Sequence, residues 1–60
     1  DVYSVRWINE HGVKDSNQYY GPEGEARARA EAALLISEGF SGVKIVLTKA
    51  IDDSKHEVPL

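Results

Sequence analysis

Residues 21–40, GPEGEARARAEAALLISEGF, are rich in Ala, Leu, Glu and Arg, the residue types with the strongest helix preference. Gly21 stands at the predicted N-cap, and Pro22 suits the first helical position because its missing N–H needs no partner there. Gly39 is free to adopt the positive φ of a C-terminal cap, and Phe40 can supply the apolar contact of that cap. This segment therefore predicts one helix, and the shorter segments on either side need it to cover them.

A period of about 3.6 residues sorts the side chains of this helix into two faces. The predicted buried face consists of small and aliphatic residues: Ala28, Ala32, Leu35, Ile36 and Gly39. The opposite, charged stripe consists of Glu23, Arg27, Glu31 and Glu38. Gly24 is a weak point in the first turn, so regular helix could begin only at Glu25. Leu34 lies within the charged stripe and is either a lone exposed leucine or a contact for a partner.

Four other segments have the β-branched, aromatic or alternating pattern of strands: Val2–Ile8, Val13–Tyr20, Val43–Lys49 and, more weakly, His56–Leu60. Tyr3, Val5 and Trp7 form the predicted core face of the first strand. Trp7 is interpreted as a core anchor, with a solvent-facing contact for a partner as the alternative. The second strand is polar enough for a sheet edge, and only one of Tyr19 and Tyr20 can face the helix.

The order strand, strand, helix, strand and a short fourth strand predicts a single α+β domain over residues 1–60. We expect a two-layer ββαβ(β) arrangement, with one helix packed on a small, mostly antiparallel sheet of three to four strands. A right-handed crossover through the helix places the third strand parallel to the second. If the third strand lies beside the first, the strand order is 2-1-3 with the first strand central, and a fourth strand would extend the sheet beyond the third.

One helix covers only one face of such a sheet, so the other face stays open. The side chains predicted on this face are mixed: Ser4, Arg6, Ile8, Lys44, Val46 and Thr48. Ile8 and Val46 would gain from being covered, so we expect a homodimer formed through this face. The candidate contacts for a partner are Arg6, Ile8, Leu34, Lys44 and Val46.

The composition excludes several classes of protein. No cysteine is present, so there is no disulfide framework, thiolate metal site or cysteine nucleophile. Ten acidic residues outnumber seven basic ones, and the resulting net charge of −3 disfavours nucleic-acid binding. No apolar run approaches the ~20 residues of a membrane span. So short a chain buries only ~60% of the surface that its unfolded form exposes, so its free energy of unfolding is small.

No motif for nucleotide, phosphate or zinc binding occurs, and there is no nucleophile elbow. The densest titratable cluster consists of Asp52, Asp53, His56 and Glu57. We interpret it as a solvated turn, because the spaced oxygen ligands and the glycine of a calcium-binding loop are missing. We therefore predict no catalytic, cofactor-binding or metal-binding residues, no cofactor and no enzymatic activity.

The helix has the pattern E-A-x-A-x-A-x-A-A-L and is followed by G-F and a Val/Ile strand. The residues that carry this pattern are Glu25, Ala26, Ala28, Ala30, Ala32, Ala33, Leu34, Gly39 and Phe40, ahead of the strand from Val43. The pattern resembles one half of the peptidoglycan-binding SPOR domain. The resemblance covers about half of the chain, which lacks the second helical repeat of that family. It implies glycan binding.

Three functional hypotheses follow. The leading one is a small non-enzymatic protein-binding module, an accessory or inhibitory protein of a bacterium or phage. The alternatives are a self-associating structural domain and a SPOR-like glycan- or nucleic-acid-binding module that uses the open sheet face with Arg6, Lys44 and the tyrosines. The expected partners are a protein of unknown identity and a second copy of the chain; nucleic acid is disfavoured, and no membrane is expected. The compartment stays undetermined, with the cytoplasm favoured.

Overall fold

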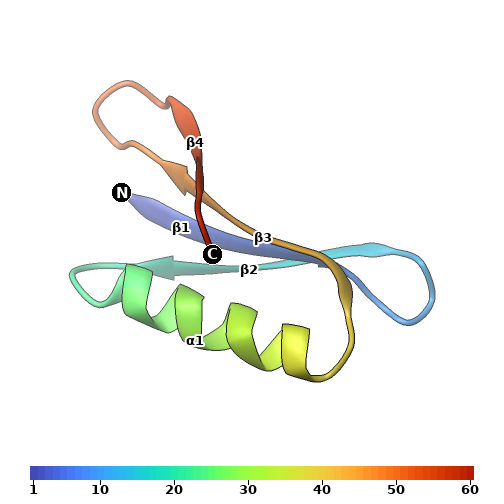
Figure 1. The fold of residues 1–60 in the computed structure, drawn as a ribbon. Coiled ribbons are helices and arrows are strands. Elements are labelled where there is room, and N and C mark those ends of the chain that lie inside the picture. Colours follow the sequence, from blue (N-terminus) through green and yellow to red (C-terminus); the bar gives the residue numbers. More distant parts are fainter.

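The computed structural model describes residues 1–60 and contains one helix packed on a four-stranded antiparallel sheet (Figure 1). The elements along the chain are β1 (Val2–Ile8), β2 (Lys14–Tyr20), α1 (Gly24–Ser37), β3 (Ser41–Thr48) and β4 (Lys55–Val58). In the sheet the order is β2-β1-β3-β4, and every neighbouring pair is antiparallel. The predicted α+β class and strand order are therefore confirmed, with β4 as the outermost strand beside β3.

β1 and β2 form a hairpin that is paired without interruption over all seven residues of each strand. In the loop, the side-chain oxygen of Asn9 accepts hydrogen bonds from the backbone N–H groups of His11 and Val13, at 2.9 and 3.0 Å. Such hydrogen bonds from a side chain to nearby backbone N–H groups stabilise a turn, because they take the place of backbone hydrogen bonds between strands. Val13 therefore belongs to the loop, and β2 begins at Lys14, one residue later than predicted.

The core lies between α1 and one face of the sheet. Val5 and Ile45, on the two central strands, are the largest fully buried side chains. Ala28, Ala32 and Leu35 complete the buried cluster from the helix. Partly buried hydrophobic residues pack around it: Tyr3, Trp7, Tyr19, Phe40, Val43 and Val58. The predicted core face of β1 is thereby confirmed.

The N-terminus of α1 differs from the prediction. The helix begins at Gly24 with Glu23 at the N-cap, whereas Gly21 has a φ of +80° and lies in the preceding turn. Gly24 is buried, and a Cβ atom on it would lie 3.2 Å from both the Tyr19 carbonyl oxygen and the Tyr3 ring. Gly24 is therefore not a weak point, because the absence of a side chain lets the first helical turn approach the sheet closely.

The C-terminus of α1 has the predicted cap. Gly39 has a φ of +88°, and its N–H donates a hydrogen bond of 3.0 Å to the Ile36 carbonyl. The N–H of Phe40 donates a hydrogen bond of 3.1 Å to the Leu35 carbonyl, and its side chain packs against the core. This pair of bonds defines a Schellman motif, which pairs carbonyl groups that would otherwise end the helix unpaired.

The buried face of α1 is narrower than predicted. Its buried residues are Gly24, Ala28, Ala32 and Leu35. Ile36 was assigned to this face but is 52% exposed, and Gly39 lies exposed beyond the end of the helix. Small residues bring α1 so close to the sheet that only side chains pointing directly at it are covered. Ile36 points ~100° around the helix from Leu35 and is therefore turned to solvent.

The residues of the charged stripe of α1 do not all face solvent, because one of them turns towards the sheet. Arg27 forms an i,i+4 ion pair with Glu23 at 3.1 Å in solvent. Glu31 instead turns towards β2, where the Asn17 side-chain amide donates a hydrogen bond of 2.8 Å to its carboxylate. The second Glu31 oxygen is buried and has no hydrogen-bond partner. Glu31 therefore connects the two layers and does not belong to the exposed stripe.

The Glu31 carboxylate influences the neighbouring Tyr19. Burial first, and then hydrogen bonding and repulsion by the Glu31 carboxylate, raise the pKa of Tyr19 from its ordinary value of 10.0. The folded state therefore disfavours the tyrosinate. We expect the free energy of unfolding to fall as the pH rises from about 10 through the higher pKa of the folded state.

Urea denaturation at pH values below and above 10 measures this decrease in the free energy of unfolding. In the Tyr19→Phe variant the free energy of unfolding should decrease less steeply with pH. Tyr20→Phe removes the same hydroxyl from the opposite face of β2 and should leave the fall unchanged. Identical pH profiles for wild type and Tyr19→Phe would contradict the prediction.

Candidate binding face

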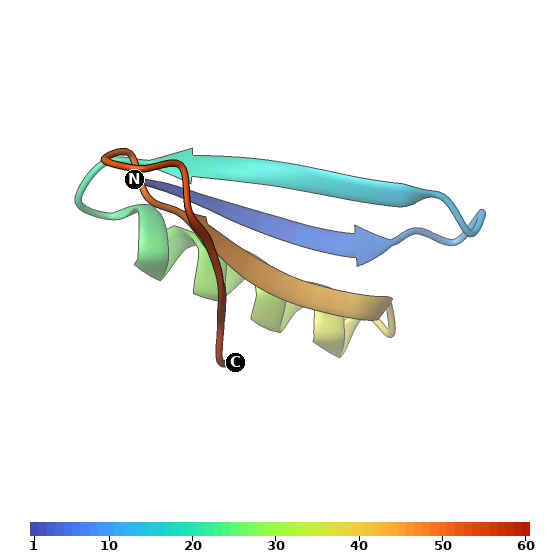
Figure 2. The same ribbon diagram turned by 90° about the horizontal axis from the view of Figure 1, so that it is seen from above.

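The sheet face that α1 does not cover is the candidate binding surface, and it is called the open face below (Figure 2). Alternation along the strands and the cross-strand register define its members. They are Val2, Ser4, Arg6 and Ile8 of β1, Lys14, Ser16, Gln18 and Tyr20 of β2, Lys44, Val46 and Thr48 of β3, and Lys55 and Glu57 of β4. The register thus places four cations on this face and one carboxylate, Glu57.

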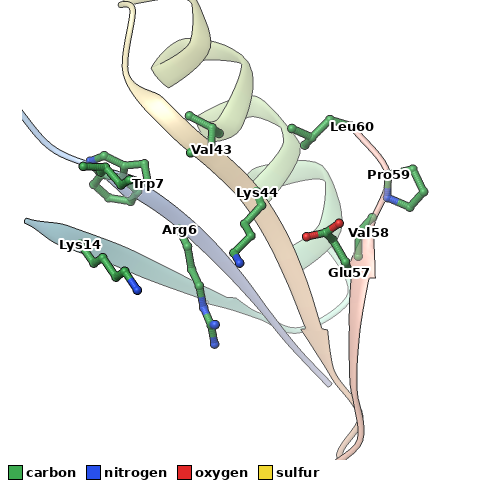
Figure 3. A pocket seen from close by; sticks show the side chains of 11 residues that line it. Arg6, Trp7, Lys14, Val43, Lys44, Glu57, Val58, Pro59 and Leu60 are labelled. Atoms are coloured by element: carbon green, nitrogen blue, oxygen red, sulfur yellow. The ribbon is translucent and has the colours of Figure 1, made fainter. Parts of the chain in front are cut away.

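The four cations of the open face are unpaired. Arg6, Lys14, Lys44 and Lys55 have no carboxylate within 4.0 Å and make no side-chain hydrogen bond. Arg6 lies directly opposite Lys44 across the β1–β3 pair. Figure 3 shows the side chains of Arg6, Lys14 and Lys44 pointing to the same side of the sheet. Like charges in opposite positions destabilise a sheet, so this arrangement costs folding free energy.

The remaining cations are all paired. Arg27 pairs with Glu23 at 3.1 Å, Arg29 with Glu25 at 3.0 Å, and Lys49 with Asp1 at 4.0 Å. The chain has ten acidic residues, yet the fold places almost all of them away from the open face. An acidic protein therefore presents one locally cationic surface.

The open face is curved. Figure 1 shows the β3–β4 hairpin rising on the side of the sheet opposite to α1. In keeping with this curvature, Ser4 is 5% and Val46 8% exposed, although both lie on the face without a helix. Val46 was predicted to support a dimer through this face. Its burial within the chain leaves it little apolar surface to offer to a second copy.

A bulge shapes one end of the open face. β3 has one extra residue between the pairs Arg6–Lys44 and Ile8–Ser41, and Gly42 in this interval has a φ of +66°. A Cβ atom on Gly42 would lie 3.2 Å from the Ile8 side chain, so glycine allows Ile8 to fold over the bulge.

A groove of about 620 Å³ lies at this bulge (Figure 3). Its charged lining residues are Arg6, Lys14, Lys44 and Glu57, and its apolar lining includes Trp7, Ile8, Val43, Val58 and Leu60. Trp7 thus packs against the core and also contributes to the groove. The groove combines unpaired cations with apolar surface.

The structure brings together four of the five predicted contact residues. Arg6, Ile8, Lys44 and Val46 lie on the open face, whereas Leu34 is 59% exposed on α1, in the other layer. Sequence reasoning missed Lys14 and Lys55. The alternation in β2 that places Lys14 beside Ile8 is weak in the sequence, and Lys55 lies just before the predicted fourth strand.

The titratable cluster lies in and after the turn between β3 and β4. The Asp52 carboxylate accepts a hydrogen bond of 3.0 Å from the Ser54 N–H, and hydrogen bonding from Ser54 lowers the pKa of Asp52. The Ser54 hydroxyl lies 2.9 Å from the His56 ring nitrogen. No three acidic or histidine side chains gather at metal-binding spacing. Ser54 and His56 line none of the grooves at the open face, the β2–α1 turn or the β1–β2 loop.

Neither protein-family models, curated proteins nor solved structures give a significant match to this chain. The SPOR resemblance rests on α1 and its C-terminal turn, and these 60 residues contain one helix. α1 is neither long enough nor apolar enough to cross a membrane.

Proposed function

We propose that this domain is a non-enzymatic protein-binding module whose open face engages an acidic segment of its partner. The observation that carries the proposal is the segregation of the cations: all four on the open face are unpaired, and the three elsewhere are paired. An approaching carboxylate would relieve the repulsion between Arg6 and Lys44. Complementary charges also steer encounter and reject like-charged partners.

The chemistry of the face favours an extended acidic peptide segment. The planar Arg6 guanidinium can hold a carboxylate in a bidentate manner, while Lys14 and Lys44 act as point charges on either side. Ile8, an apolar side chain of the open face that also lines the groove, would contact an aliphatic side chain between the carboxylates. The partner segment is thus expected to present both acidic and aliphatic residues on the side that faces the sheet.

A single-stranded nucleic acid fits the face less well. Such ligands bind on platforms of exposed aromatic side chains. The open face has one aromatic residue, Tyr20, at the end of β2, and its hydroxyl donates a hydrogen bond of 2.8 Å to Gln18. The net charge of −3 also opposes the approach of a polyanion.

The proposal is tested with a short fluorescein-labelled peptide rich in Glu and Leu, by fluorescence anisotropy at low and physiological salt. The double variant Arg6→Gln/Lys44→Gln should bind at least about tenfold more weakly, a loss of about 1.4 kcal/mol. Binding by the wild type should weaken with added salt, because exposed charges are screened.

A matched control is Arg27→Gln/Lys49→Gln, which also removes two cations and changes the net charge from −3 to −5. Both residues are exposed and outside the open face, so this variant should keep wild-type affinity. Equal losses in the two double variants, or no binding of the peptide, would overturn the proposal. Tighter binding of a labelled single-stranded oligonucleotide would assign the face to nucleic acid instead.

A further inference from the structure

β2 is an exposed edge of the sheet with few protective features. It is seven residues long, contains no proline, and pairs with β1 without a bulge. In Figure 2 it forms one margin of the sheet. The opposite edge is protected: β4 has four residues, and Pro59 follows it, with its carbonyl accepting a hydrogen bond of 2.9 Å from Arg29.

We propose that β2 pairs antiparallel with β2 of a second copy of this chain, with Asn17 on the two-fold axis. This register uses all seven residues of the strand, because Asn17 is its middle residue. It extends the sheet to eight strands and keeps both α1 helices on the same side. Self-association through this edge is independent of the function proposed for the open face.

The charges of β2 fit this register. Lys14 and Asp15 are its only charged residues, and the two-fold axis places them opposite Tyr20 and Tyr19 of the partner subunit. No like charges of the two β2 strands oppose each other. Lys14 and Tyr20 both lie on the open face, so the ammonium group of one subunit meets a tyrosine ring that is 64% exposed in the single chain.

Pairing of β2 with a second β2 would also stabilise the domain. A sheet edge exposes backbone N–H and C=O groups that a second strand can satisfy. A short chain without disulfides commonly gains stability by association. α1 contacts β2 from one face of the sheet, and no strand of the same chain pairs with the outer backbone edge of β2.

The register is tested by exchanging charges at positions 16 and 18, which oppose each other across the proposed axis. Ser16→Glu/Gln18→Glu sets carboxylates against carboxylates in the dimer and should weaken dimerisation at least about tenfold. Within one chain Ser16 faces Arg6, so the new carboxylate at position 16 gains an opposite charge and the fold is kept. Ser16→Glu/Gln18→Lys sets opposite charges together and should retain or strengthen the dimer.

Sedimentation equilibrium over a wide concentration range gives the readout, and thermal melts verify folding of each variant. The wild type should approach twice the 6.6 kDa mass of the chain as its concentration rises. A mass of 6.6 kDa at every concentration would overturn the proposal. Equal weakening by the two double variants would also overturn it, because the proposed register predicts opposite effects for them. No acidic peptide is present, so the result does not depend on the function of the open face.

Discussion

Replacing Leu35 with alanine is expected to reduce the free energy of unfolding by about 2–4 kcal/mol. Leu35 is the one large side chain that α1 contributes to the buried cluster, where it packs with Val5 and Ile45. Its truncation leaves a cavity that the rigid sheet cannot close. It also removes an apolar contact of the C-terminal cap. In a 60-residue domain this loss is a large share of the total free energy of unfolding. The variant should therefore be largely unfolded at 37 °C.

The neighbouring Ile36 provides the matched control, because Ile36→Ala removes a similar volume from a side chain that is 52% exposed. Urea denaturation followed by circular dichroism should show a loss of no more than about 1 kcal/mol for this variant. An Ile36→Ala variant as unstable as Leu35→Ala would mean that the buried face of α1 is wider than the structure shows.

Replacing Ala28 with leucine is expected to destabilise the domain by about 1–3 kcal/mol or more, although leucine is a good helix former. Ala28 is fully buried in the middle of the interface between α1 and the sheet. Three added heavy atoms there would push the helix away from the sheet. That shift would weaken the contacts of Gly24 and Ala32 as well, because all three lie along one line of the helix.

Ala30→Leu is the control for this prediction, since Ala30 lies on the exposed side of the same helix. Its effect should stay within about 0.5 kcal/mol in the same denaturation experiment. If the two variants unfold at the same urea concentration, the close approach of α1 to the sheet is not what holds the layers together.

The two proposed surfaces would act together. Pairing through β2 joins the open faces of two subunits into one continuous sheet surface, because residues opposite each other across the axis lie on the same face. A partner with two acidic segments could then contact both subunits, and linked binding exceeds the affinity of either contact alone. The charge-exchange variants and the Arg6/Lys44 variant separate association from partner binding.

The elements and their order along the chain follow from local features of the sequence. The strands were predictable from local features, namely the β-branched run of β1 and the Val/Ile pattern of β3. Gly39 and Phe40 marked the end of α1 because a Schellman motif needs only a positive φ and a few local hydrogen bonds. The handedness rule then predicted that β3 runs parallel to β2, and the structure places β3 beside β1.

Only the tertiary structure brings Lys14 and Lys55 onto the same surface as Arg6 and Lys44. These four cations come from four strands, and their meeting depends on the β1–β2, β1–β3 and β3–β4 registers. Ile36 became exposed and Gly24 essential because the helix lies closer to the sheet than its residue period alone implies. Pairing register and interlayer distance depend on contacts between residues far apart in the chain, whereas capping and strand preference depend on neighbours.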